Sequence, residues 1–105
     1  MNSHELAEKT AGLASRVNNL AVNQTGKESR ELLQEQNRLA RLAYAAMVKD
    51  LDEENEAYQA ALSGLNIAIK YIGNADQQIE GVAEAIRLAA KAADMVETAL
   101  KVAAM

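Results

Sequence analysis

The chain has 105 residues and a formal net charge of -4 at neutral pH, and it contains no Trp, Phe, Cys or Pro. This length corresponds to a single domain over 1–105, and the absence of cysteine excludes disulfides and Cys-based zinc sites. An acidic balance with scattered Lys and Arg argues against binding to nucleic acid. Twenty-two residues are Ala, the best helix former, so the composition predicts an all-α fold.

Helix-start signals divide the chain into three segments. An N-cap residue followed three positions later by Glu or Gln occurs at Asn2, Thr25 and Asn74. Gly26 and Gly73 lie beside two of these caps and could end the preceding helices. The predicted helices are about 3–23, 27–72 and 75–104.

The first predicted helix carries one simple apolar line on an otherwise polar surface. Its members are Leu6, Leu13, Val17 and Leu20. A single line of this kind covers one neighbouring helix.

The middle segment contains an acidic stretch that decides the architecture. Five of the fifteen acidic residues fall between Asp50 and Glu56, but no Gly or Pro precedes them to stop a helix. A stripe that starts at Leu33 and includes Met47, Leu51 and Tyr58 also keeps one helical phase across the stretch. We therefore expect one long helix, and its alternative is a break near 50–55 that produces a compact four-helix up-down bundle.

The last predicted helix is apolar over most of its circumference. Two heptad-spaced lines face one way, and Leu88, Met95 and Val102 form a further line. Such a helix needs cover on two sides. Because two short helices folded against one long helix leave a thin rod, we expect a homodimer to complete the bundle.

Residues that could carry chemistry are scarce. Asp50-x-Asp52 begins like a calcium-binding loop, but Asn55 replaces the required Gly and Ala61 replaces the bidentate Glu. His4 is the only histidine, which excludes a di-iron carboxylate site. Its place in the first turn of a terminal helix leaves no residue to orient it, which argues against a catalytic triad. We therefore expect no enzymatic activity, no metal and no cofactor.

The function predicted from these observations is a self-associating helical protein that binds another protein, in the manner of an adaptor, chaperone or assembly component. The alternative is a lipid-surface protein, which the net acidic charge disfavours. Without an apolar leader we expect a cytoplasmic location, and secretion without a signal stays open. The candidate interface residues are Met47, Leu51, Tyr58, Leu88, Met95 and Val102.

Overall fold

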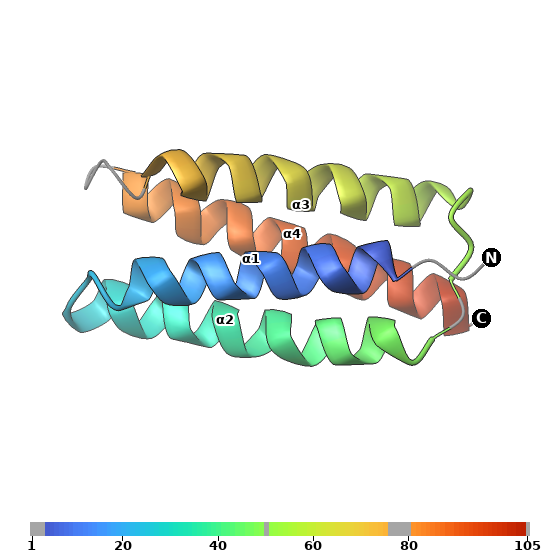
Figure 1. Cartoon of the computed structure of the whole chain (residues 1–105), viewed down its shortest axis with the longest axis horizontal. Coiled ribbons are helices and arrows are strands. Elements are labelled where there is room, and N and C mark those ends of the chain that lie inside the picture. The colour runs from blue at the N-terminus through green and yellow to red at the C-terminus, as the bar shows by residue number, and fades with distance from the viewer. Residues whose placement is uncertain (1–3, 50, 76–80, 105) are drawn as a thin grey trace.

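The computed structural model describes residues 4–49, 51–75 and 81–104, and within them the chain forms four helices and no strand. The helices run alternately up and down along a bundle 40 × 20 × 17 Å in extent, and both chain ends lie at the same end of it (Figure 1). The helices are α1 (Glu5–Ala21), α2 (Gly26–Met47), α3 (Glu56–Ala75) and α4 (Val82–Ala104).

Each helix packs mainly against two neighbours around the bundle, and α1 and α4 also touch across its centre. α1 pairs with α2, α3 pairs with α4, and the two pairs join through α1 with α3 and through α2 with α4. α2 and α3 do not touch one another, although they follow in sequence, so their connection crosses one end of the bundle diagonally (Figure 1). The outer faces of α2 and α3 consequently lie on opposite sides of the molecule.

The prediction of one helix over 27–72 is wrong, and its four-helix alternative is confirmed. α2 ends at Met47 and α3 begins at Glu56, and the acidic residues Asp52, Glu53 and Glu54 lie in the connection between them. The thin rod that motivated a homodimer is therefore absent, since α2 and α3 of the same chain cover α4.

Local hydrogen bonds explain why the acidic stretch leaves the helix. The Asp52 carboxylate accepts a hydrogen bond from the backbone N–H of Glu54 at 3.0 Å, and the Asn55 side-chain oxygen accepts one from Ala57 at 2.8 Å. The second bond is an N-cap for α3. Gln59 also donates from its side chain to the Glu53 carbonyl. Short polar side chains thus offer the backbone turn and cap partners that compete with a continuous helix.

The phase argument failed because its stripe does not follow the buried face of α2. Leu33 is 40% exposed and Met47 is 53% exposed, whereas the neighbouring Leu32 and Leu39 are fully buried. Leu32 and Leu39 lie about 100° and 120° around the helix from Leu33. The predicted stripe therefore joined an exposed apolar face of α2 to a buried face of α3, although these faces belong to two separate helices.

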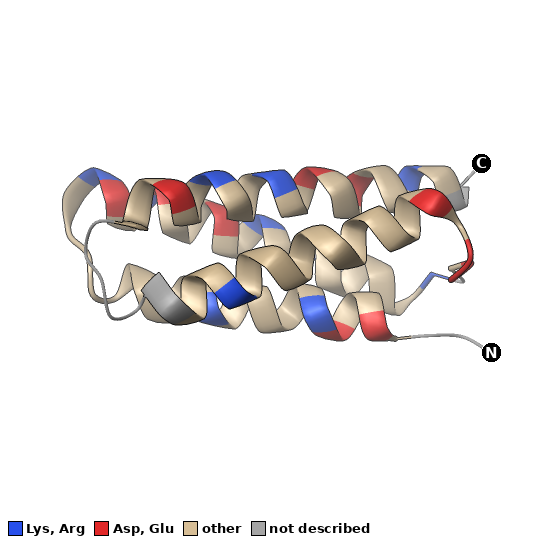
Figure 2. Ribbon diagram, turned by 90° about the horizontal axis from the view of Figure 1, so that it is seen from above, with Lys and Arg blue, Asp and Glu red and all other residues tan. Residues whose placement is uncertain are grey.

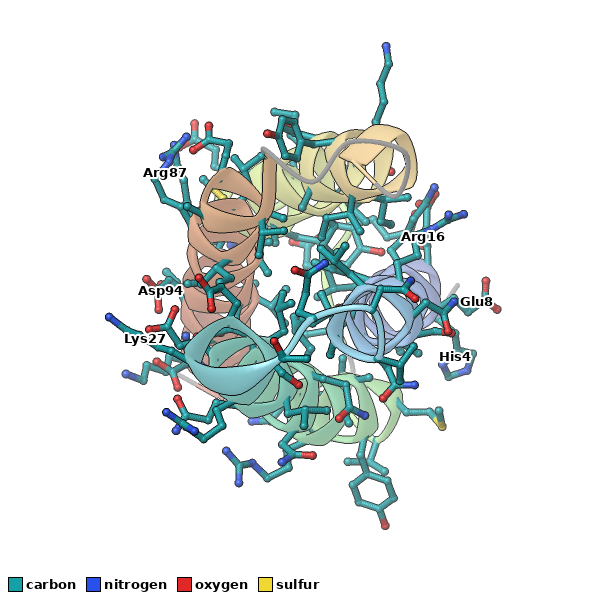
Figure 3. All side chains as sticks on the ribbon, turned by 90° about the vertical axis from the view of Figure 1, so that its left-hand side faces the viewer. His4, Glu8, Arg16, Lys27, Arg87 and Asp94 are labelled. Carbon is teal, nitrogen blue, oxygen red and sulfur yellow. The ribbon has the colours of Figure 1, made fainter. Side chains whose placement is uncertain are left out.

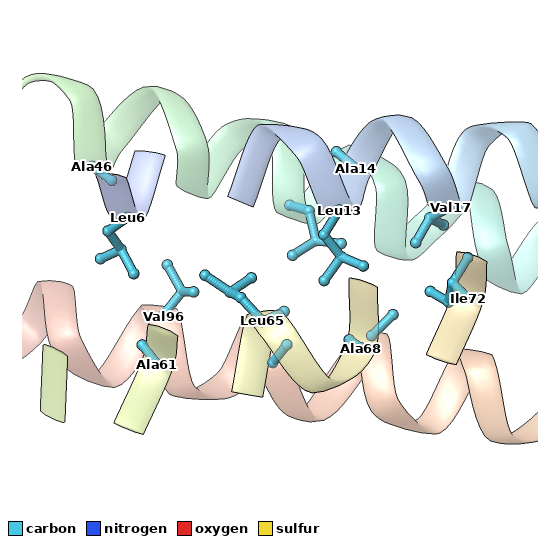
Figure 4. Packing of buried hydrophobic residues seen from close by; sticks show 14 of the residues in the cluster. Leu6, Leu13, Ala14, Val17, Ala46, Ala61, Leu65, Ala68, Ile72 and Val96 are labelled. Carbon is cyan, nitrogen blue, oxygen red and sulfur yellow. The ribbon is translucent and has the colours of Figure 1, made fainter. Parts of the chain in front are cut away.

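The core is built from leucines on one side and small residues on the other. Leu6, Leu13 and Val17 of α1 point towards α3, where Leu65 and Ile72 meet them (Figure 4). Alanines fill most of the buried positions of α4, which lets that helix approach closely. The core alanines of α4 are Ala85, Ala89, Ala92, Ala93 and Ala99.

Of the predicted helix starts, the position of Thr25 is confirmed and that of Asn74 is wrong. Thr25 is the N-cap of α2, although its side chain makes no capping hydrogen bond. Gly26 follows it with a φ of 67° that suits glycine. Gly26 is the first residue of α2 and does not end α1, which stops at Ala21. α3 continues through Gly73 to Ala75, so neither Gly73 nor Asn74 separates two helices there. At the amino end His4 precedes α1, and Asn2 and Gln77 lie outside the described residues.

Candidate interaction surface

The six candidate interface residues are divided between core and surface. Leu51 is 7% exposed and Tyr58 is 3% exposed, so both belong to the core within one chain and leave no surface there for a partner. Burial of Leu51 anchors the α2–α3 connection over the end of the core. Met47 and Val102 are exposed. The remaining two candidates, Leu88 and Met95, are half-buried on α4.

Leu88 and Met95 line a groove between α3 and α4. The groove has a volume of about 190 Å³, and Ile67 stands beside it with 56% of its surface exposed. A second depression of about 320 Å³ continues it towards Thr98 and shares Ala60, Lys91 and Met95 with it. We call the first hollow the α3–α4 groove; its lining residues are Ala60, Ser63, Gly64, Ile67, Leu88, Lys91, Ala92 and Met95.

Gly64 has no side chain, and this leaves space for the Met95 side chain at the bottom of the groove. A Cβ atom added at Gly64 would lie 2.6 Å from the sulfur of Met95, closer than two such atoms can approach. The Met95 side chain therefore lies in the space that a larger residue would occupy. Glycine inside a helix costs about 1 kcal/mol relative to Ala, and here that cost permits Met95 to cross onto α3.

The solvent-facing side of α3 carries very little charge. Glu56 and Lys70 are the two charged residues in this helix of 20, and they lie near its opposite ends. Figure 2, in which α3 is nearest the viewer, shows an uncharged ribbon between them, while the other helices alternate acidic and basic residues. Depletion of charge in the middle of a surface is typical of protein interfaces.

A separate apolar stripe runs along the outer face of α2. Tyr44 is 70% exposed and Val48 is 69% exposed, and both lie on the same side as Met47 and Leu33. We call Leu33, Tyr44, Met47 and Val48 the α2 stripe. The sequence analysis placed Leu33 and Met47 on one stripe that continued to Leu51 and Tyr58, and it named Met47 as a candidate interface residue. The buried face of α2 carries a second apolar set, which the sequence analysis did not compare with the stripe. Its members are Leu32, Leu39, Ala43 and Ala46.

A charge cluster joins α2 to α4 on another side of the bundle. Arg38 donates to the Asp94 carboxylate at 2.6 Å, and its guanidinium lies 3.6 Å from Glu97 and 3.9 Å from Glu35. Burial raises the pKa of Glu35, partly offset by Arg38, and the hydrogen bond with Asp94 raises the pKa of Arg38. One buried oxygen of Glu35 lacks a hydrogen-bond partner among the described residues. The cluster joins α2 to α4, and Asp94 also lines the second depression beside the α3–α4 groove.

Groups suited to metal chemistry do not come together in the described ranges. No set of three or more His, Asp or Glu side chains there could hold a metal ion. His4 and Glu8 project outward from α1, away from the other helices (Figure 3). Asp52 and Asn55, which begin the calcium-like pattern, use their side-chain oxygens in the turn bonds described above.

Across the described segments, no helix combines the length and apolarity needed to cross a membrane. Comparisons with protein-family models, curated proteins and solved structures gave no match.

Proposed function

We propose that this chain is a non-enzymatic helical interaction protein that self-associates and presents an apolar helical surface to another protein. The observation that carries the proposal is the α2 stripe, where Tyr44, Met47 and Val48 are each more than half exposed although the core is complete without them. Tyr and Met are enriched in protein interfaces, because both offer a large contact area.

The shape of the α2 stripe fits a helical partner. Its residues recur at helical spacing over Leu33 to Val48, which corresponds to about 22 Å of helix. A second amphipathic helix laid along this ridge would cover all four side chains. The α3–α4 groove lies on a different side, so one surface can serve another protein while the other serves self-association.

Photo-crosslinking tests the first of these surfaces. We expect p-benzoylphenylalanine in place of Tyr44 to form an adduct with one defined protein in cells, and Met47→Glu in the same chain to abolish that adduct. The matched control places the same amino acid at Gln34, which is exposed on α2 but outside the stripe. The partner identified by mass spectrometry must also bind the purified wild-type chain and not Met47→Glu. Equal adducts from both positions would contradict the proposal.

A second candidate function, association with a lipid surface, has one observation in its favour. The exposed Arg41 lies three residues before Tyr44 on α2, so a cation borders the apolar stripe. The net charge of -4 opposes this function. Flotation with neutral and anionic vesicles separates the candidates: recovery of wild type with anionic vesicles, and its loss in Arg41→Glu, would favour lipid over protein.

A further inference from the structure

We infer that the outer face of α3 pairs with the same face of a second copy of this chain, with the two α3 helices antiparallel and Ser63 of each copy at the two-fold axis. This inference rests on the self-association in the proposed function and specifies its geometry.

The first observation is where the two charges of α3 lie. Glu56 and Lys70 are each seven residues from Ser63, and both are exposed. At about 100° per residue, both lie within about 20° of Ser63 around the helix. Seven residues correspond to about 10 Å of helix. The outer face of α3 is therefore acidic at one end, basic at the other and uncharged between them.

Charge complementarity selects the second copy as occupant and fixes its direction. When two α3 helices run antiparallel about Ser63, Glu56 of each copy lies beside Lys70 of the other, which forms two opposite-charge pairs. A parallel arrangement instead places Glu56 against Glu56 and Lys70 against Lys70. Neither Glu56 nor Lys70 forms an ion pair with another described residue of its own chain.

The second observation is the apolar contact that the same register creates. Residues whose numbers add up to about 126 face one another, so Ile67 of one copy meets Ala60 of the other. Ile67 is 56% exposed, and Ala60 lines both hollows between α3 and α4. Each copy thus inserts one large apolar side chain at the groove of its partner. A two-fold interface requires this self-complementarity, because the same surface of each copy must supply both the protruding Ile67 and the groove that accepts it.

Charge reversal at the two ends of α3 tests the pairing, measured by sedimentation equilibrium with the full chain at low salt. Each of Glu56→Lys and Lys70→Glu turns two attractive pairs into repulsive ones, so we expect each to raise the dimer dissociation constant by about tenfold. The double variant Glu56→Lys/Lys70→Glu restores opposite charges across the axis. We expect its dissociation constant to return to within about threefold of the wild-type value.

Matched controls keep the result specific. Glu56 also lies in the first turn of α3, where an acid favours the helix dipole, so Lys70→Glu is the cleaner single variant. Ser63→Glu places two like charges at the axis and should leave a monomer with unchanged helical content by circular dichroism. Lys27→Glu, on α2, should leave the dissociation constant at the wild-type value.

The outcomes separate this inference from the proposed function. Weakening in both single variants together with recovery in the double variant supports antiparallel pairing through α3. A dimer whose dissociation constant none of these α3 variants changes overturns the pairing and leaves self-association in place. A wild-type monomer at every concentration up to about 1 mM overturns both, and binding through the α2 stripe is then decided by the Tyr44 crosslink alone.

Discussion

Gly64 and Met95 should be energetically coupled, because the Met95 side chain occupies the space of a Gly64 Cβ. Gly64→Ala gains about 1 kcal/mol of helix propensity but brings the new methyl to 2.6 Å from the Met95 sulfur. Overpacking of this kind costs about 1–3 kcal/mol. We expect Gly64→Ala to lower the free energy of unfolding by about 1 kcal/mol in the wild-type background.

Removing Met95 should reverse the sign of this effect. In a Met95→Ala background the obstruction is gone, so Gly64→Ala should stabilise the chain by about 1 kcal/mol. The coupling energy of the double-mutant cycle is then about 2 kcal/mol. Gly12→Ala is the matched control, because nothing lies within 4 Å of a Cβ added to that glycine of α1. We expect Gly12→Ala to stabilise the chain by about 1 kcal/mol in either background.

Urea unfolding followed by circular dichroism measures these free energies. The protein should be kept at low micromolar concentration, so that self-association does not add to the apparent stability. If Gly64→Ala stabilised the wild type as much as Gly12→Ala does, Met95 would not lie over Gly64. The packing described for the α3–α4 groove would then be wrong.

Three further predictions test other parts of the fold. Leu39→Ala should lower the unfolding free energy by about 3 kcal/mol, whereas Leu33→Ala should change it by less than about 0.5 kcal/mol; similar losses at both positions would contradict the assigned register of α2. Asn55→Ala should cost about 1 kcal/mol through loss of the α3 cap, and an unchanged unfolding midpoint in urea would exclude that cap. Because burial raises the pKa of Glu35 above 4.5 in the folded chain, the stability from this group is present at low pH and is lost as pH rises through the folded pKa. The free energy of unfolding of the wild type should therefore fall relative to that of Glu35→Gln as pH rises from about 4 to neutral. If the unfolding free energies of the two proteins changed in parallel with pH, the raised pKa of Glu35 would be refuted.

The helical class and most core positions of three helices could be predicted from sequence. Leu6, Leu13 and Val17 form the buried line of α1 as their spacing indicates, and Val96 of α4 is buried on a heptad-spaced line. Helical periodicity suffices at these positions because each lies on an apolar line that faces the core. The break near 50–55 was only the alternative prediction because no Gly or Pro precedes it, whereas Asp and Asn side chains form the turn.

The candidate surface was harder to predict, because the sequence does not say which apolar face is buried. α2 has two such faces, and tertiary packing chose Leu32 and Leu39 over Leu33 and Met47. The α3–α4 groove depends on Met95 reaching Gly64 from another helix, a contact between residues 31 positions apart. Periodicity within one helix contains no information about that contact.

Disulfide formation by a single cysteine tests the α3 pairing most directly, since the natural chain contains no cysteine. Ser63→Cys places one thiol from each copy at the proposed two-fold axis. Under mild oxidation we expect this variant to become a covalent dimer rapidly, while Ser15→Cys, exposed on α1, stays largely monomeric. The two cysteines forming dimers at equal rates, or Ser63→Cys staying monomeric at concentrations where the wild type is a dimer, would contradict the assignment of α3 as the self-association surface.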